Sequence, residues 1–184
     1  METQTPAVND SFLNLIPIPL PEELDNLKKS ILTEGCRDPL VVWAETNTLL
    51  DGHNRLSICL EHDLPYQVKL MSFADENEAK VWIILNQFSR RNLNPFQRSE
   101  LALKLESIFA AQARKNQGAR THPEPIRTRE AVAEVAAVSH GTLDKVKAIS
   151  QEAHPSLAEA VRKGEVSIDA AYQVATAHPQ GKAG

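Results

Sequence analysis

The sequence predicts an α+β protein: an N-terminal α/β domain followed by an all-α domain that contains a helix-turn-helix. Over residues 12–91, short apolar runs typical of strands alternate with helical patterns. From residue 92 onward almost every pattern is helical. Charge divides the chain in the same way. Residues 1–82 hold 14 Asp/Glu against 6 Lys/Arg, whereas residues 83–184 hold 10 against 14, which indicates two modules with different partners.

Composition excludes several classes of protein. The 184 residues are 42% hydrophobic and 24% charged, as in ordinary globular proteins. No apolar run approaches the roughly 18–20 residues of a membrane span, and the polar N-terminus is not a secretory signal. The two cysteines, Cys36 and Cys59, show neither a metal-binding spacing nor a disulfide framework. We therefore expect a cytoplasmic protein that does not enter a membrane.

The first domain, residues 12–91, is expected to contain three helices and three strands. The first helix, over 19–35, has an apolar face formed by Leu24, Leu27, Ile31 and Leu32, and Gly35 can cap its C-terminus. The remaining elements are expected at strands 39–44 and 46–52, helix 55–62, strand 66–73 and helix 74–91.

The second domain, residues 92–178, is expected to be helical throughout. A helix over 95–117 begins with a proline in its first turn, and a linker over 118–129 follows. The helix-turn-helix spans 128–150, with helices at 129–136 and 140–149. Further helix-forming sequence precedes a tail, 179–184, that we expect to be disordered.

The segment DGHNR, residues 51–55, lies between a strand and a helix. Glycine allows close backbone approach, and the first N–H groups of a helix attract anions. Gly52, His53, Asn54 and Arg55 are therefore candidates for holding phosphates, with Arg55 suited to a bidentate contact. The alternative is a polar turn that caps the helix, with Arg55 in a structural ion pair.

A second polar segment, NQFSRRNLNPFQRSE over 86–100, carries Arg90, Arg91 and Arg98 around Asn94. Arginines on a loop between two helices could close over a bound triphosphate or lie along a phosphate backbone. A solvated interhelical turn is the alternative.

The third segment is the helix-turn-helix. Its inner face is expected to comprise Val132, Val135, Ala136, Val138, Leu143, Val146 and Ile149. The residues expected to contact DNA are Arg129, Ser139, His140, Thr142 and Lys145. Asp144 on the same helix would repel phosphate. A small helical bundle that binds protein is the alternative.

These three segments, in this order, resemble the ParB/sulfiredoxin superfamily, and specifically a ParB-like DNA-binding protein. DGHNR lies where ParB proteins have a G-x-R-R nucleotide motif, and residues 90–95 are similar to the core of their second motif. The resemblance implies a nucleotide site, a clamp that slides on DNA, and a role in plasmid or mobile-element partition, maintenance or regulation. Two positions depart from the family pattern. Asn54 replaces the first arginine of the G-x-R-R motif, so only Arg55 matches it. Asn86-Gln87 replaces a Glu-Asn pair that helps to hold Mg²⁺, and loss of this carboxylate weakens the metal site and hydrolysis.

The resemblance also implies site residues and partners. Phosphates would contact Gly52, His53, Asn54 and Arg55; Arg90, Arg91 and Asn94 would close over them, and Gly35 would shape the adjoining loop. The expected ligand is a nucleoside triphosphate or diphosphate, CTP or ATP/ADP, with Mg²⁺. The expected partners are double-stranded DNA and a second copy of the chain, in a nucleoid- or plasmid-associated complex. The sequence identifies no catalytic residue and no protein metal site.

Other branches of the superfamily provide an enzymatic alternative. Sulfiredoxins have a catalytic cysteine where His53 stands, so that activity is not expected. ADP-dependent serine kinases carry a motif close to DGHNR and need a carboxylate, for which Glu22, Glu23, Glu34 and Asp51 are candidates. Small plasmid-borne nucleotide hydrolases and nucleases form a third branch.

Overall fold

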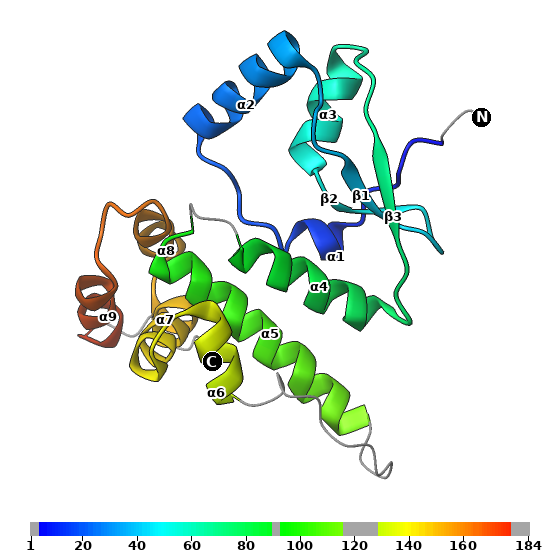
Figure 1. The fold of residues 1–184 in the computed structure, drawn as a ribbon. Coiled ribbons are helices and arrows are strands. Elements are labelled where there is room, and N and C mark those ends of the chain that lie inside the picture. The colour runs from blue at the N-terminus through cyan, green and yellow to red at the C-terminus, as the bar shows by residue number, and fades with distance from the viewer. Residues whose placement is uncertain (1–3, 90–92, 116–128, 178–184) are drawn as a thin grey trace. The chain divides into compact units, whose positions relative to one another are not determined.

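The computed structural model describes residues 4–89, 93–115 and 129–177, and it confirms the α+β fold class (Figure 1). The chain divides into two compact units, residues 1–84 and 85–184, so that the division falls within helix α4 (Glu76–Phe88). In the described part of the chain, no helix has the length and apolar character needed to cross a membrane.

The first unit contains a small three-stranded sheet. Its strands are β1 (Leu40–Trp43), β2 (Thr48–Asp51) and β3 (Val68–Met71), in the order β2-β1-β3. β1 and β2 form an antiparallel hairpin, and β3 runs parallel to β1. The described helices of this unit are α1 (Asp10–Leu13), α2 (Pro21–Glu34), α3 (His53–Glu61) and the first part of α4.

Two of the apolar clusters formed by described residues fix the helices of this unit. Leu40 and Val42 of β1 pack with Leu49 of β2 and Leu56 of α3, which fixes α3 against the sheet. Ile31 of α2 packs against α3 through a second cluster that also contains Ile58 and Cys59. The helix that begins at DGHNR is therefore packed on both the sheet and α2.

Three expectations for the first unit need correction. The apolar face of α2 is narrower than expected, since Leu24 is 39% and Leu32 is 49% exposed while Ile31 is buried. Helix α3 begins at His53 rather than at residue 55, because Gly52 already turns the chain into the helix. The four-residue helix α1 is too short to produce a periodic pattern and was not expected.

The second unit is helical in the part that the structure describes. Its helices are α5 (Pro95–Lys115), α6 (Arg129–Ala136), α7 (His140–Glu152), α8 (Pro155–Arg162) and α9 (Ile168–Ala177). The core at one end of α5 consists of buried residues from four helices: Phe96, Val146, Ile149, Val161, Ala171 and Ala175. Gly164, at φ +79°, separates α8 from α9.

The pattern of the two helices α6 and α7 agrees closely with expectation. Val132, Ala136, Leu143, Val146 and Ile149 are buried. Val135, expected on the inner face, is only half-buried. Val138, expected to be buried in the turn, is also half-buried, because Ala137 at φ +53° turns the chain at the surface. Residues 118–128 of the expected linker and the tail over 179–184 lie outside the described residues, whereas Arg129, the last residue of that linker, begins α6.

Candidate functional site

The turn into α3 depends on Gly52. Its φ of +98° lies in the left-handed region, and a Cβ placed there would lie 2.6 Å from Cδ2 of Leu40 and 3.0 Å from Nη2 of Arg55. Gly52 is also the N-cap of α3, so the N-cap residue has no side chain to bond the first N–H groups of the helix. The segment DGHNR therefore presents backbone donors beside the half-buried side chains of His53 and Asn54.

Arg55 is held by the protein itself. Its Nη2 donates to Oδ2 of Asp51 at 3.2 Å and to the carbonyl oxygen of Pro39 at 3.2 Å. The two charged side chains are only 17% and 12% exposed, so this ion pair is shielded from water. Arg55 therefore forms a structural ion pair, which was the alternative role considered for it. A phosphate contact by the same side chain stays a prediction.

Gly35 lies at the other end of the segment that anchors Arg55. It is the C-cap of α2 at φ +79°, with its N–H bonded to the carbonyl oxygen of Ile31 at 2.9 Å. A Cβ there would meet no atom within 4 Å. The segment 35–39 therefore runs from an open glycine to the Pro39 carbonyl that accepts from Arg55. Its role beside a phosphate stays a prediction.

Three of the four candidate catalytic carboxylates have local structural partners. Oε2 of Glu23 accepts from the Leu20 N–H at 2.8 Å, Glu34 pairs with Arg37 at 2.9 Å, and Asp51 pairs with Arg55. Glu22 is exposed on the first turn of α2. Among the described residues, no three His, Cys, Asp or Glu side chains form a group that could hold a metal ion.

The second motif belongs to the other unit, and Arg90 and Arg91 lie outside the described residues. Asn94 caps α5: its Oδ1 accepts from the Gln97 N–H at 3.0 Å, and Oε1 of Gln97 accepts from the Asn94 N–H at 3.0 Å. Nδ2 of Asn94 also donates to the carbonyl oxygen of Arg162 at 2.9 Å. The Asn94 amide thus supports the fold, and contact with a nucleotide stays a prediction.

Two neighbours of this motif have roles that sequence reasoning missed. Arg98 donates through Nε to the Ala136 carbonyl at 2.6 Å and through Nη1 to the Phe88 carbonyl at 3.3 Å. Gln87 is fully buried, and its side-chain amide has no hydrogen-bond partner among the residues that the structure describes. The partners of Arg98 are distant in the sequence and the burial of Gln87 depends on tertiary packing, so no local pattern could have identified either feature.

The residues expected to contact DNA lie on α6, on α7 and in the turn between them. Ser139 is the N-cap of α7, and its Oγ accepts from the Thr142 N–H at 3.1 Å. The two hydroxyls of this cap lie 2.9 Å apart. His140 and Lys147 are exposed, and Lys145 is half-exposed. Apart from Arg129 on α6, these polar groups lie at the N-cap or in the N-terminal part of α7.

Carboxylates partly neutralise this surface. Arg129 of α6 pairs with Asp144 of α7, and its Nε lies 3.6 Å from Oε1 of Glu106. The hydrogen bond to Asp144 raises the pKa of Arg129. Lys145 pairs with Asp169 of α9 at 2.5 Å. Two of the expected phosphate-binding cations therefore have acidic partners inside the unit.

Comparison with known proteins identifies the fold. No protein-family model and no curated protein matches the chain. Among solved structures, the C2221 form of a pNOB8-like ParB-N domain matches with a TM-score of 0.64 and 21% identity, over 94% of this chain and 76% of that one. The fold is that of a ParB N-domain. A second pNOB8-like ParB N-domain structure gives a TM-score of 0.63 and 23% identity, over 94% of this chain and 72% of that one.

A more distant ParB structure also matches. The C-terminally truncated chromosome-partitioning protein ParB from Caulobacter crescentus, complexed with CTP-gamma-S, is 16% identical over 94% of this chain and 88% of its own, with a TM-score of 0.39. The similarity to the pNOB8-like ParB N-domains confirms the ParB-like fold that the three sequence motifs predict.

Proposed function

We propose that the chain is a ParB-like DNA-binding protein that acts in the partition, maintenance or regulation of a plasmid or mobile element. The ParB N-domain fold, which extends over 94% of the chain, is the observation that carries the proposal. The polar first turns of α7, above the buried Leu143 and Val146, support DNA binding, because a recognition helix contacts bases through such residues.

DNA binding can be tested by fluorescence anisotropy of labelled duplexes at several salt concentrations. We expect affinity to fall steeply with salt, because bound cations displace counterions from phosphates. His140→Ala and Lys145→Ala should each weaken binding, whereas Lys29→Ala should not. Lys29 is exposed on α2 in the first unit, so its loss removes the same charge as Lys145→Ala at a different place. Unchanged binding in both α7 variants would contradict this placement of the recognition helix.

We also propose that the turn into α3 binds the phosphates of a nucleotide, CTP or ATP/ADP, accompanied by Mg²⁺. Its support is the uncapped start of α3 beside Asn54 and His53. The residues fit the phosphates better than the metal, since the described residues contain no metal-binding group. The ion would accompany the nucleotide rather than occupy a site built by the protein.

Calorimetric titration with CTP, ATP and ADP, each with Mg²⁺ and with or without DNA, tests the nucleotide proposal. Asn54→Asp should abolish binding by repelling phosphate, and Asn54→Ala should weaken it less. Arg55→Ala is a poorer probe because it also breaks the ion pair with Asp51. Preference for CTP would support a partition-type clamp. Preference for ATP or ADP would favour the alternative of a small-molecule kinase, hydrolase or nuclease, and no binding would refute the site.

We further propose a homodimer, because helix-turn-helix proteins commonly bind paired half-sites as dimers. Sedimentation velocity of the chain alone, with nucleotide and with DNA would measure its oligomeric state. A monomer under all three conditions would refute this part of the proposal.

A further inference from the structure

The two cysteines, which the sequence gives no reason to pair, belong to the same apolar cluster. Cys59 is buried in α3 at 1% exposure, within a cluster that includes Ile31 and Ile58. Cys36, in the segment that follows α2, packs against the same cluster, and its nearby thiol contributes to the raised pKa of Cys59. Both thiols are free.

The two thiols differ in their access to solvent. Cys36 is half-buried, and its Sγ lies 3.5 Å from the carbonyl oxygen of Asp38 near the surface. Cys59 is enclosed, and burial raises the pKa of its thiol to about 11. A solvent-borne oxidant therefore meets Cys36 first, while Cys59 is held next to it as a protonated thiol.

The surrounding chain can accommodate a bond between the sulfurs. A disulfide requires an S–S distance of about 2 Å, shorter than a thiol hydrogen bond. Gly35, directly before Cys36, has open space around the position of a Cβ, and the neighbouring Arg37 side chain is 71% exposed. The segment that carries Cys36 can thus move toward α3 without disturbing packed side chains.

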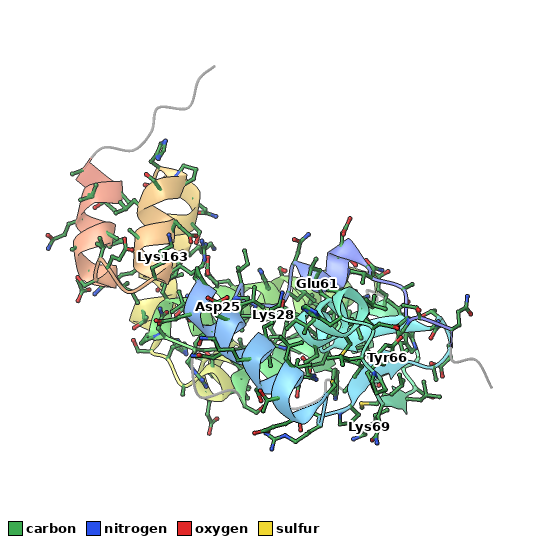
Figure 2. The ribbon with its side chains drawn as sticks, turned by 90° about the horizontal axis from the view of Figure 1, so that it is seen from above. Asp25, Lys28, Glu61, Tyr66, Lys69 and Lys163 are labelled. Carbon is green, nitrogen blue, oxygen red and sulfur yellow. The ribbon has the colours of Figure 1, made fainter. Side chains whose placement is uncertain are left out.

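The α2–α3 pair is already joined on its surface near this cluster. Nζ of Lys28 on α2 donates to Oε1 of Glu61 on α3 at 2.8 Å, and Figure 2 labels both residues. This hydrogen bond lowers the pKa of Glu61. A disulfide at Cys59, two residues before Glu61, would reinforce the contact that already exists between α3 and the C-terminal end of α2.

We propose that Cys36 and Cys59 form a reversible intramolecular disulfide when the protein meets a peroxide. The Cys36 thiolate attacks one peroxide oxygen, the O–O bond breaks, and Cys36 becomes a sulfenic acid as the other oxygen leaves as water. The Cys59 sulfur then attacks the Cys36 sulfur, forms the S–S bond and expels the hydroxyl, which takes the Cys59 proton and leaves as water. Two thiols and one hydrogen peroxide thus give one disulfide and two waters.

The bridge would act on the segment that holds Arg55. Residues 36–39 carry both Cys36 and the Pro39 carbonyl that accepts from Arg55 at 3.2 Å, and Cys59 lies one helical turn beyond Arg55 on α3. Oxidation would tie this segment to α3 and limit its movement at the start of the helix. The resulting change in nucleotide affinity rests on the function proposed above, but formation of the disulfide does not.

The test is non-reducing peptide mapping of the full chain after treatment with stoichiometric hydrogen peroxide. We expect a linked peptide containing Cys36 and Cys59, a mass loss of two hydrogens per chain, a monomer on a non-reducing gel, and reversal by dithiothreitol. Because the chain has only these two cysteines, no other intramolecular pair competes. The oxidised protein should melt roughly 5–10 °C higher by tryptophan fluorescence, because the bridge restricts the unfolded chain.

Two variants make the test specific. In Cys59→Ala the first step survives, so dimedone should trap a Cys36 sulfenic acid and no bridge should form. In Cys36→Ser the buried Cys59 should resist dimedone and peroxide. Two free thiols after peroxide treatment, or a disulfide found only between chains, would overturn the proposal. Neither readout involves nucleotide or DNA, so failure here and failure of the proposed function are distinguishable.

Discussion

Gly52 and Gly35 show how two glycines of similar conformation differ at the residue scale. Both have positive φ, at +98° and +79° respectively. A Cβ at Gly52 would overlap Leu40 and the Arg55 guanidinium, whereas one at Gly35 would meet nothing within 4 Å. A residue with a Cβ would therefore have a strained backbone at both positions, and of the two it would overlap neighbouring atoms only at Gly52.

We predict that Gly52→Ala lowers the free energy of unfolding of the first unit by about 2–4 kcal/mol, and Gly35→Ala by about 1–2 kcal/mol. Urea titration followed by tryptophan fluorescence would measure both values, since Trp43 and Trp82 lie in the first unit. Equal losses in the two variants would show that the overlap with Leu40 and Arg55 relaxes freely.

At the element scale, a charged clamp joins α5 to α8. Arg162 donates through Nε to Oε2 of Glu100 at 3.0 Å and through Nη2 to Oε1 at 2.6 Å, and its guanidinium lies 5.8 Å from the centre of the Phe96 ring. Such a bidentate, stacked arrangement requires the planar group of arginine. These contacts anchor α5, whose first residues, from Pro95, belong to the second polar segment over 86–100.

We predict that Arg162→Lys destabilises the second unit by about 1–2 kcal/mol, since lysine can satisfy only one of the two carboxylate bonds and does not stack on the ring. Lys163→Ala is the matched control. Lys163, labelled in Figure 2, lies 3.9 Å from Glu159 with a half-exposed side chain, so its loss should change stability by less than about 0.5 kcal/mol. Far-UV circular dichroism during urea titration would measure the stability of both variants. Equal losses would contradict a stabilising role for the contacts of Arg162 with Glu100 and Phe96.

The pair of helices α6 and α7 provides a second prediction at this scale. Asp144 pairs with Arg129, so it both adds a negative charge and restrains a cation on the proposed DNA-binding surface. We predict that Asp144→Asn strengthens DNA binding several-fold and makes it more sensitive to salt. Glu152→Gln, at the far end of α7, changes the net charge equally. If the two variants had the same effect in anisotropy titrations, overall charge rather than the released Arg129 would be responsible.

At the scale of the whole molecule, acidic and basic residues are distributed unequally along the chain. Residues 1–82 have a formal charge of −8 and residues 83–184 of +4. Several cationic side chains in the described part of residues 83–184 already have partners within the protein. Arg98 binds carbonyl oxygens and Arg129 binds carboxylates. Formal charge therefore overstates the number of cations available to DNA.

We predict that the two units unfold with separable transitions. Both tryptophans lie in the first unit, whereas circular dichroism also detects the helices of the second. Gly52→Ala should shift the tryptophan transition more than the circular dichroism transition, and Arg162→Lys should do the reverse. Coincident curves for both variants would establish a single cooperative unit.

The sequence alone was sufficient for the fold class and for most elements. Short apolar runs, one alternating segment and helical patterns located the three described strands and most of the described helices, because each pattern depends on residues a few positions apart. The glycine at the turn into α3 and the two helices around Val138 were predictable for the same reason. The three motifs in order predicted the ParB-like fold, which the structural comparison confirms.

Only the tertiary structure decided which side chains are already engaged. Arg55 with Pro39, Arg98 with Ala136, Lys145 with Asp169 and Cys36 with Cys59 are contacts between residues 16 to 38 positions apart. No local pattern contains such a partner, because it is brought close by the packing of whole helices and strands. For the same reason the sequence identified the polar residues of the candidate sites but not the partners that occupy them.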